Sequence, residues 1–346
     1  MAAHAQKNAP HATEIKTVAV TGGTGFVGRH IVRELLSRGL SVRVPARDAQ
    51  KAGEVIPEEA VTGTTAGGGS AQVILGDIFD DHAVASLVDG ADACIHLIGI
   101  IREARNGQTF ERMHVEAVEK ITEACAQAGC HRYLHMSAIA ADPEGGAAYQ
   151  KTKFRGEQVV RGSALDWTIF RPGFIHGPDG EFVGMMKGWA EGRKAPFAFL
   201  PYFTRIEQEG VPGPANPPAI KNPVVAPVHV DDVAKAFADA LTRPESVGEV
   251  YRLAGPEEIS FPDMLRFVRD TVPHGKDGMP AIGLPGPIAA AKAQAAKFLG
   301  LGGLLPFDYG MALMGEKDVL ADNTKARTHL GFEPRAFRES AKAYLA

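Results

Sequence analysis

Residues 17–28 read Thr-Val-Ala-Val-Thr-Gly-Gly-Thr-Gly-Phe-Val-Gly, and this stretch decides the fold. Its first residues have the apolar, β-branched character of a buried strand, and three glycines follow at intervals of three, Gly22, Gly25 and Gly28. Apolar residues then recur at helical spacing through 31–36. The order of strand, glycine turn and helix is typical of a site that binds the pyrophosphate of a dinucleotide.

Each glycine of this turn has its own physical reason. Gly22 permits the tight turn, Gly25 has no Cβ to obstruct the phosphates, and Gly28 lets the helix pack close to the strand. The helix N-terminus adds unpaired N–H groups and the positive end of the helix dipole. We therefore predict that the residues of the turn bind a cofactor: Gly22, Thr24, Gly25, Phe26, Val27 and Gly28.

The composition limits the function classes. The chain has 346 residues, which suggests one or two domains and a core that needs no disulfide. Its formal net charge is −4 and its basic residues are dispersed, which argues against a nucleic-acid partner. Cys94, Cys125 and Cys130 form no CxxC pair, and an odd number of cysteines fits a reducing compartment. We expect buried thiols and no metal site.

The N-terminal residues predict a frayed tail, 1–15. Residues 1–14 lack the apolar stretch of a secretory signal and the arginines of a mitochondrial transit peptide. No apolar run is long enough to cross a bilayer. The expectation is a cytoplasmic protein, with the inner face of a membrane as a candidate location.

The first half of the chain alternates between strand and helix patterns. This alternation predicts a parallel, doubly wound sheet, that is, an α/β fold of the Rossmann type. A glycine-rich stretch within 61–72 reads as a flexible surface insertion. The expected strands are 41–46, 73–77, 91–100, 132–136 and 167–170, and the expected helices are 82–88, 110–128 and 149–161.

The pattern changes beyond Gly177. Residues 205–224 are rich in proline and predict a long irregular loop, whereas 227–234 predict a short strand and a helix capped by an aspartate. We expect a dinucleotide-binding domain over 16–180 and a smaller C-terminal lobe over 181–346. Residues 225–255 are candidates for a return to the main sheet, with a strand at 248–253.

The end of the second strand bears on the choice of cofactor. Arg47 stands where an arginine would pair with the 2′-phosphate of NADP(H). Asp48 follows directly, and an acidic residue there would bind the ribose hydroxyls, so NAD(H) is the alternative. A solvated surface charge is the alternative reading of Arg47. Asp77, with Ile78 beside it, ends the third strand and could accept from the adenine amino group or make a turn. The sequence favours NADP(H).

Two residues form the candidate catalytic pair. Tyr149 and Lys153 have the i, i+4 spacing that puts a phenol and an ammonium on one face of a helix. A nearby ammonium lowers the pKa of a tyrosine, as acid–base chemistry on a carbonyl requires. An exposed helix with a chance pair is the alternative. Gly99 after the fourth strand would bring backbone close to the cofactor, or is a simple strand-end glycine.

These motifs together resemble the short-chain dehydrogenase/reductase superfamily, in its extended or atypical branch related to NAD-dependent epimerases and dehydratases. The resemblance covers most of 16–260. It rests on the glycine turn, the Tyr149/Lys153 pair, the segment Arg-Pro-Gly-x-x-x-Gly-Pro at 171–178 and the segment 228–234. It implies that Lys153 bonds the nicotinamide ribose, that Pro172 and Phe174 lie near the nicotinamide, and that His229 and Asp232 organise the lobe junction.

Two positions depart from the superfamily's pattern. Ser137 is the candidate for the hydroxyl that bonds the substrate oxygen, but a gap-free alignment with sugar-nucleotide epimerases puts Ala138 there. The usual asparagine of the preceding helix is replaced by His114. The catalytic tetrad is thus incomplete, with Tyr149 and Lys153 remaining.

With its incomplete tetrad, the chain is similar to one subgroup of this superfamily. That subgroup contains the NAD(P)H-binding accessory subunit of respiratory complex I (NADH:ubiquinone oxidoreductase). Segments 95–99 and 330–334 also resemble the sequences of that subgroup. Two functions follow. The first is an oxidoreductase or epimerase/dehydratase that moves hydride at a carbonyl or carbinol carbon. The second is a cofactor-stabilised scaffold for respiratory-complex subunits or a quinone pathway. Residues 286–305 are a candidate peripheral membrane helix, or pack on the core.

Overall fold

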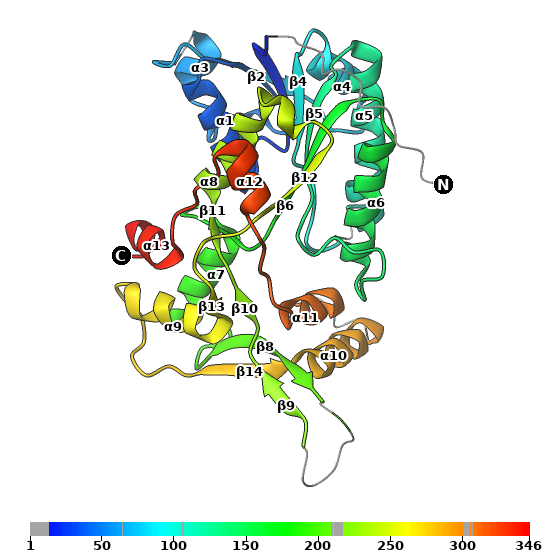
Figure 1. Ribbon diagram of the computed structural model, residues 1–346. Coiled ribbons are helices and arrows are strands. Elements are labelled where there is room, and N and C mark those ends of the chain that lie inside the picture. Colours follow the sequence, from blue (N-terminus) through cyan, green and yellow to red (C-terminus); the bar gives the residue numbers. More distant parts are fainter. Residues whose placement is uncertain are drawn as a thin grey trace.

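The computed structural model describes residues 14–63, 65–104, 107–208, 210, 217–299, 305 and 307–346. A seven-stranded parallel sheet forms its centre, in the order β12-β6-β5-β4-β1-β2-β3 (Figure 1). Because the order reverses between β1 and β4, a crevice for a ligand is expected at the carboxyl edge there. The strands are β1 (Thr17–Thr21), β2 (Ser41–Ala46), β3 (Ser70–Leu75), β4 (Ala93–His96), β5 (Arg132–Met136), β6 (Asp166–Pro172) and β12 (Glu249–Leu253).

Helices cover both faces of this sheet (Figure 1). Successive residues of β1 point to opposite faces: Val18 and Val20 join one core cluster and Ala19 joins the other. The first cluster lies under α1 (Phe26–Ser37), α8 (Val230–Leu241) and α12 (Thr324–Leu330), and the second under α4 (Asp81–Val88), α5 (Ala117–Ala128) and α6 (Ala148–Gly162). The doubly wound α/β fold predicted from the sequence is therefore confirmed.

A smaller lobe lies beyond the carboxyl edge of the sheet (Figure 1). A three-stranded sheet in the order β14-β8-β9 forms its floor. Short ladders, β7 with β11 and β10 with β13, join it to the main domain. Its elements are β7 (Ile175–His176), α7 (Glu181–Ala190), β8 (Leu200–Glu207), β9 (Ala219–Lys221), β10 (Val224–Val225), β11 (Val228–His229), β13 (Ile259–Ser260), α9 (Phe261–Thr271), β14 (Ala281–Pro285), α10 (Gly286–Phe298), α11 (Tyr309–Gly315) and α13 (Phe337–Leu345).

Several local predictions need correction. The stretch 205–224 contains the end of β8, all of β9 and the start of β10, and 209 and 211–216 within it lie outside the described residues. The glycine-rich stretch 61–72, expected to be a flexible surface insertion, includes the start of β3. This strand pairs with β2, with Ser70 opposite Ser41. The helix α8 is capped by His229, whose ring accepts from the Asp231 N–H at 3.2 Å, and not by an aspartate.

The structure adds two short helices, a 3₁₀ turn and a π-helical turn. The helices α2 (Ala49–Gly53) and α3 (Glu58–Thr62) follow β2, and the 3₁₀ turn η2 (Pro244–Ser246) precedes β12. The turn η1 (Arg112–Glu116) opens the predicted helix 110–128. Among the described residues, no helix is both long enough and apolar enough to span a membrane.

Candidate cofactor and active site

The glycine turn between β1 and α1 leaves room for an anion. Gly22 has a φ of +74°, in the left-handed region that favours glycine. A Cβ on Gly28 would lie 2.1 Å from the Gly22 carbonyl oxygen, so only glycine allows α1 this close. The N-cap of α1, Gly25, supplies no side-chain hydrogen bond. The first N–H groups of α1 therefore receive no side-chain cap from Gly25. Such groups can donate to an anion, as the binding of a pyrophosphate requires.

The other residues predicted in this turn act through backbone or packing. Val27 is buried in the core, so its side chain faces away from the crevice. Phe26 packs on the turn before α7, because a Cβ on Gly180 would lie 3.2 Å from Phe26 Cζ. Thr24 is half-buried at the turn itself.

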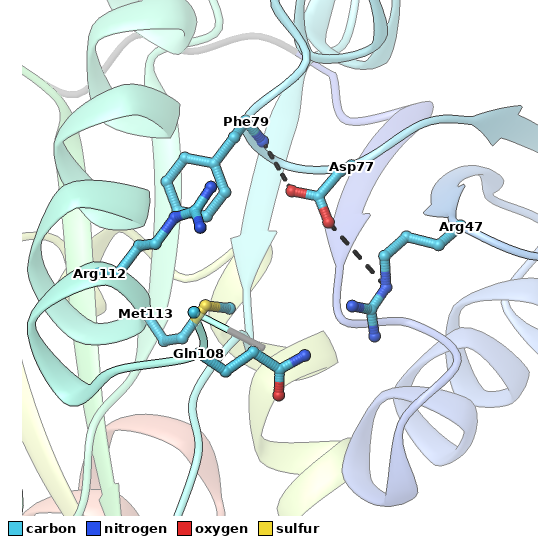
Figure 2. Close-up of a pocket in the computed structure, with 7 residues that line it drawn as sticks. Arg47, Asp77, Phe79, Gln108, Arg112 and Met113 are labelled. Carbon is cyan, nitrogen blue, oxygen red and sulfur yellow. Dashed lines mark hydrogen bonds and ion pairs between the residues drawn. The ribbon is translucent and has the colours of Figure 1, made fainter. Parts of the chain in front are cut away.

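A pocket of about 150 Å³ lies at the carboxyl ends of β2 and β3. Figure 2 shows Arg47 and Asp77 on one side of it and Arg112 and Met113 on the other. Arg47 Nε lies 3.9 Å from Asp77 Oδ2, and Asp77 Oδ1 accepts from the Phe79 N–H at 3.0 Å. The carboxylate thus makes the turn that was one reading of Asp77, and it also faces the arginine. Its bond to the adenine amino group stays a prediction. Ile78 is buried in the core and offers only its backbone.

The opposite wall of this pocket was missed by the sequence reasoning. The Arg112 guanidinium lies over the Phe79 ring, 4.2 Å from its centroid. Gln108 and Met113 complete the wall. Nothing in a motif marks these residues, since they belong to a loop and to the π-helical turn η1. They meet Arg47 only through the pairing of distant strands.

The candidate catalytic pair lies on α6, beside the carboxyl ends of β4 and β5. Lys153 is 5% exposed, and its Nζ donates to the Met136 carbonyl oxygen at 2.8 Å. A Cβ on Gly99 would lie 3.3 Å from Lys153 Nζ, so the exposed backbone after β4 passes close over the ammonium. Tyr149 lies one helical turn before Lys153 on α6. This arrangement puts both side chains at the same edge of the sheet as the glycine turn.

Burial controls the acid–base properties of this pair. Burial lowers the pKa of Lys153 to about 8, although the negative charge of Glu157 acts in the opposite direction. Burial raises the pKa of Tyr149 to about 12. The sequence predicted a lowered pKa for this tyrosine. The direction differs because the Lys153 ammonium donates to the Met136 carbonyl and desolvation of the phenol dominates.

His114 occupies the position beside the pair. Its Nδ1 lies 2.9 Å from Thr152 Oγ1, and its Nε2 lies 3.1 Å from Ile100 N and 3.0 Å from Ile100 O. Burial lowers the pKa of His114 to about 3, so the ring is neutral. Its edge-to-face contact with Tyr149, with centroids 5.3 Å apart, fixes the phenol ring. The π-helical turn that carries His114 is a feature frequent at functional sites.

Ser137 does not face the crevice. Its Oγ donates to Glu157 Oε1 at 2.6 Å, and the residue is 4% exposed. Arg171 binds the same carboxylate through two hydrogen bonds of 2.7 and 2.6 Å. The predicted role of Ser137 in bonding the substrate oxygen does not fit this geometry, because the hydroxyl is committed to a buried ion pair. Ala138, the next residue, has no hydroxyl to replace it.

The segment after β6 closes the crevice toward the lobe. The Pro172 carbonyl accepts from the Ile139 N–H at 3.0 Å, so Pro172 lies beside the loop that follows β5. Phe174 is half-buried, and its ring packs edge-to-face on Phe182 with centroids 5.2 Å apart. Both residues follow β6 at the carboxyl edge of the sheet, and their contact with the nicotinamide stays a prediction.

The remaining predicted features are structural. His229 caps α8, and Asp232 on α8 pairs with Arg335 at 2.8 Å. Cys94, Cys125 and Cys130 are buried free thiols. Among the described residues, no cluster of histidine, cysteine or acidic side chains has the geometry of a metal site.

Comparisons with known proteins agree with this geometry. Residues 22–188 match the model of the NAD(P)H-binding family. The mitochondrial 40 kDa subunit of NADH-ubiquinone oxidoreductase from Neurospora crassa is 28% identical over 252 residues, covering 73% of this chain and 59% of that protein. Ceramide reductase from Caulobacter vibrioides is 32% identical over 176 residues, covering 49% of this chain and 50% of that protein. The matches therefore span only part of these relatives.

The fold is shared with a solved enzyme. UDP-glucuronic acid 4-epimerase from Bacillus cereus, solved in complex with NAD, aligns with a TM-score of 0.65 and 19% identity over 95% of this chain and 98% of that one. Such a likeness shows the fold alone. The family match confirms the sequence-based resemblance to NAD(P)H-binding proteins, and the shared fold agrees with it. Homology to the complex I subunit confirms the resemblance to that subgroup.

Proposed function

We propose that this homologue of NAD(P)H-binding short-chain dehydrogenases is an oxidoreductase that moves hydride at a carbonyl or carbinol carbon. The observation that carries the proposal is the position of Tyr149 and Lys153. They lie on one face of α6, and Gly99 passes over Lys153 at the end of β4, next to the glycine strand β1. The phenol, the ammonium and the glycine turn thus lie at one edge of the sheet, which supports a shared cofactor site.

The residues of this crevice can supply the proton chemistry. When bound, a nicotinamide dinucleotide supplies or accepts hydride at C4 of its ring. Tyr149 keeps its proton at neutral pH, since burial raises its pKa to about 12, and can donate it to a carbonyl oxygen during reduction. Lys153 is mostly an ammonium at neutral pH and stabilises the phenolate that remains. His114 fixes the tyrosine ring.

We further propose that NADP(H) is favoured over NAD(H). Arg47 and Arg112 bring two guanidinium groups to the pocket at the ends of β2 and β3. Asp77 faces Arg47 at 3.9 Å, a long and exposed contact that a dianionic phosphate can outcompete. Charge therefore supports the phosphorylated cofactor.

Replacing Arg47 with alanine is expected to lower the affinity for NADPH roughly tenfold and leave that for NADH nearly unchanged. The reason is the loss of charge-assisted hydrogen bonds to the 2′-phosphate alone. Titration of cofactor fluorescence measures both dissociation constants. The matched control is Arg33→Ala, which removes an exposed arginine from α1. An unchanged ratio of NADPH to NADH affinity would refute the assignment.

A second candidate is a cofactor-stabilised accessory protein that serves respiratory-complex subunits. The relative from Neurospora crassa, a subunit of NADH-ubiquinone oxidoreductase, favours it. The Ser137 hydroxyl is withdrawn into the Glu157 pair, as a protein without turnover tolerates. A ligand that binds only the folded chain stabilises it by mass action.

The candidate membrane contact at 286–305 belongs to this second proposal. The helix α10 buries Ala289, Ala290 and Ala293, while Ile288 is 47% exposed and Phe298 is 92% exposed. Residues 300–304 lie outside the described residues. The exposed apolar side chains at the end of α10 support a peripheral contact with a membrane or a membrane-bound partner.

The rate at which bound NADPH leaves the protein tests the choice between these functions. We expect exchange within seconds, because an enzyme that turns over must release its oxidised cofactor. Nucleotide fluorescence after a chase with excess NADP measures this rate. Retention for hours would contradict the oxidoreductase and support the accessory role, and copurification with respiratory-complex subunits would then be examined.

A further inference from the structure

The helix α11 packs against the N-terminal end of α6, the helix that carries Tyr149. A Cβ on Gly310 would lie 3.4 Å from Ala147 Cβ, and a Cβ on Gly146 would lie 3.6 Å from Leu313 Cδ1. Figure 1 shows α11 on the side of the lobe that faces the main domain. Ala147 is the N-cap of α6, two residues before Tyr149. The Leu313 side chain therefore lies beside the loop that leads into the N-terminus of α6.

A second apolar contact lies beside the expected nicotinamide position. A Cβ on Gly173 would lie 3.2 Å from Val319 Cγ1 and 3.6 Å from Ile139 Cδ1. Ile139 belongs to the loop after β5, and Val319 follows α11 and bridges to Val225. Both side chains are half-buried. Branched aliphatic groups from two distant segments thus meet directly after Pro172.

Two arginines near this wall, Arg102 and Arg205, already have partners. Arg102 Nη2 lies 3.5 Å from the Met311 sulfur, and Arg102 Nε lies 3.9 Å from Asp308 Oδ2. Arg205 on β8 pairs with Glu207 at 2.6 Å and with Asp318 at 3.3 Å. A substrate diphosphate would have to displace Glu207 and Asp318 from Arg205, because tight binding of phosphate groups relies on arginine or lysine.

We infer that the substrate is an uncharged carbonyl compound whose flank is apolar, and that Leu313, Val319 and Ile139 receive that flank. This inference rests on the proposed oxidoreductase function. In the reducing direction, hydride from C4 of NADPH adds to the carbonyl carbon, and the Tyr149 proton adds to its oxygen. NADPH becomes NADP⁺ and the carbonyl becomes an alcohol, so electrons and protons balance. We therefore expect a nucleotide sugar to bind poorly here.

A homologous series of aryl alkyl ketones, from acetophenone to octanophenone, tests the inference. Each added methylene should lower KM about two- to fourfold, because each adds apolar area buried against the wall. UDP-glucose should neither react nor inhibit. A flat series, or preferential binding of UDP-glucose, would overturn the inference.

Calorimetric titration of the ketones into NADP-saturated protein separates this inference from the proposed function. If binding tightens with chain length but no ketone is reduced, the apolar wall stands and the oxidoreductase proposal fails. If the ketones are reduced but their binding does not depend on chain length, the oxidoreductase proposal stands and the apolar wall fails. Absence of any ketone binding overturns the inference.

Variants locate the wall. Leu313→Asp should abolish the dependence on chain length and raise KM for octanophenone at least tenfold, with the affinity for NADPH unchanged. The control is Ile220→Asp, which alters a side chain that is 66% exposed on β9 of the same lobe and should change neither quantity. A Leu313→Asp protein that folds, binds NADPH and keeps the chain-length dependence would overturn the assignment.

Discussion

Replacing Tyr149 with phenylalanine is expected to lower kcat for carbonyl reduction by about 10²- to 10⁴-fold, the usual contribution of a positioned general acid. Phenylalanine keeps the ring contacts with His114 and Phe110, whose centroids lie 5.3 and 5.8 Å from that of Tyr149. Only the hydroxyl is lost, so the fold and the affinity for NADPH should be nearly unchanged. The loss belongs to kcat because no group that donates a proton remains at that point.

Steady-state oxidation of NADPH with a reactive ketone measures this effect, and cofactor fluorescence measures binding. Tyr202→Phe is the matched control, since it removes a hydroxyl that donates to Asn222 on the exposed face of the lobe. If Tyr149→Phe reduces ketones at the wild-type rate, the hydroxyl is not the acid. If neither protein reduces any ketone and NADPH is retained for hours, the accessory role is supported instead.

Local patterns were sufficient to predict the main sheet. The bounds predicted for β2 and β5, 41–46 and 132–136, agree with the structure because buried strands between turn residues have an unambiguous pattern. The helix α1 could be predicted because apolar residues recur at helical spacing after the glycine turn. These features depend on neighbours in sequence, which a single chain displays fully.

Features that depend on distant partners could not be predicted. Ser137 stands after a strand, as a catalytic serine would, but its direction is set by Glu157 and Arg171, which lie 20 and 34 positions further along the chain. The strand β9 forms in a proline-rich stretch because β8 offers it an open edge. The wall formed by Phe79 and Arg112 likewise arises from a contact across the pocket.

Replacing Glu157 with glutamine is expected to destabilise the protein by about 3 kcal/mol, because it removes one partner of a buried ion pair. Glu157 is fully buried, and Arg171 is 14% exposed in its side chain. The neutral amide can accept from one N–H of the guanidinium but presents its own donors to the rest. Glu111→Gln is the matched control, since it breaks the pair that Glu111, before η1, forms with Arg155 on α6. The side chains of Arg155 and Glu111 are 56% and 43% exposed, so stability should change by less than about 1 kcal/mol.

The same substitution should alter the pH dependence of catalysis, which a purely structural role of Glu157 would not do. Burial lowers the pKa of Lys153 to about 8, and the Glu157 charge one helical turn away opposes that effect. Without this charge the pKa of Lys153 falls further, so the ammonium that stabilises the Tyr149 phenolate is lost at lower pH. The fall in kcat/KM for ketone reduction, expected near pH 8 in the wild type, therefore moves toward neutral pH in Glu157→Gln. Profiles of kcat/KM against pH measure this displacement, and coincident profiles for the two folded proteins would show that Glu157 acts on stability alone.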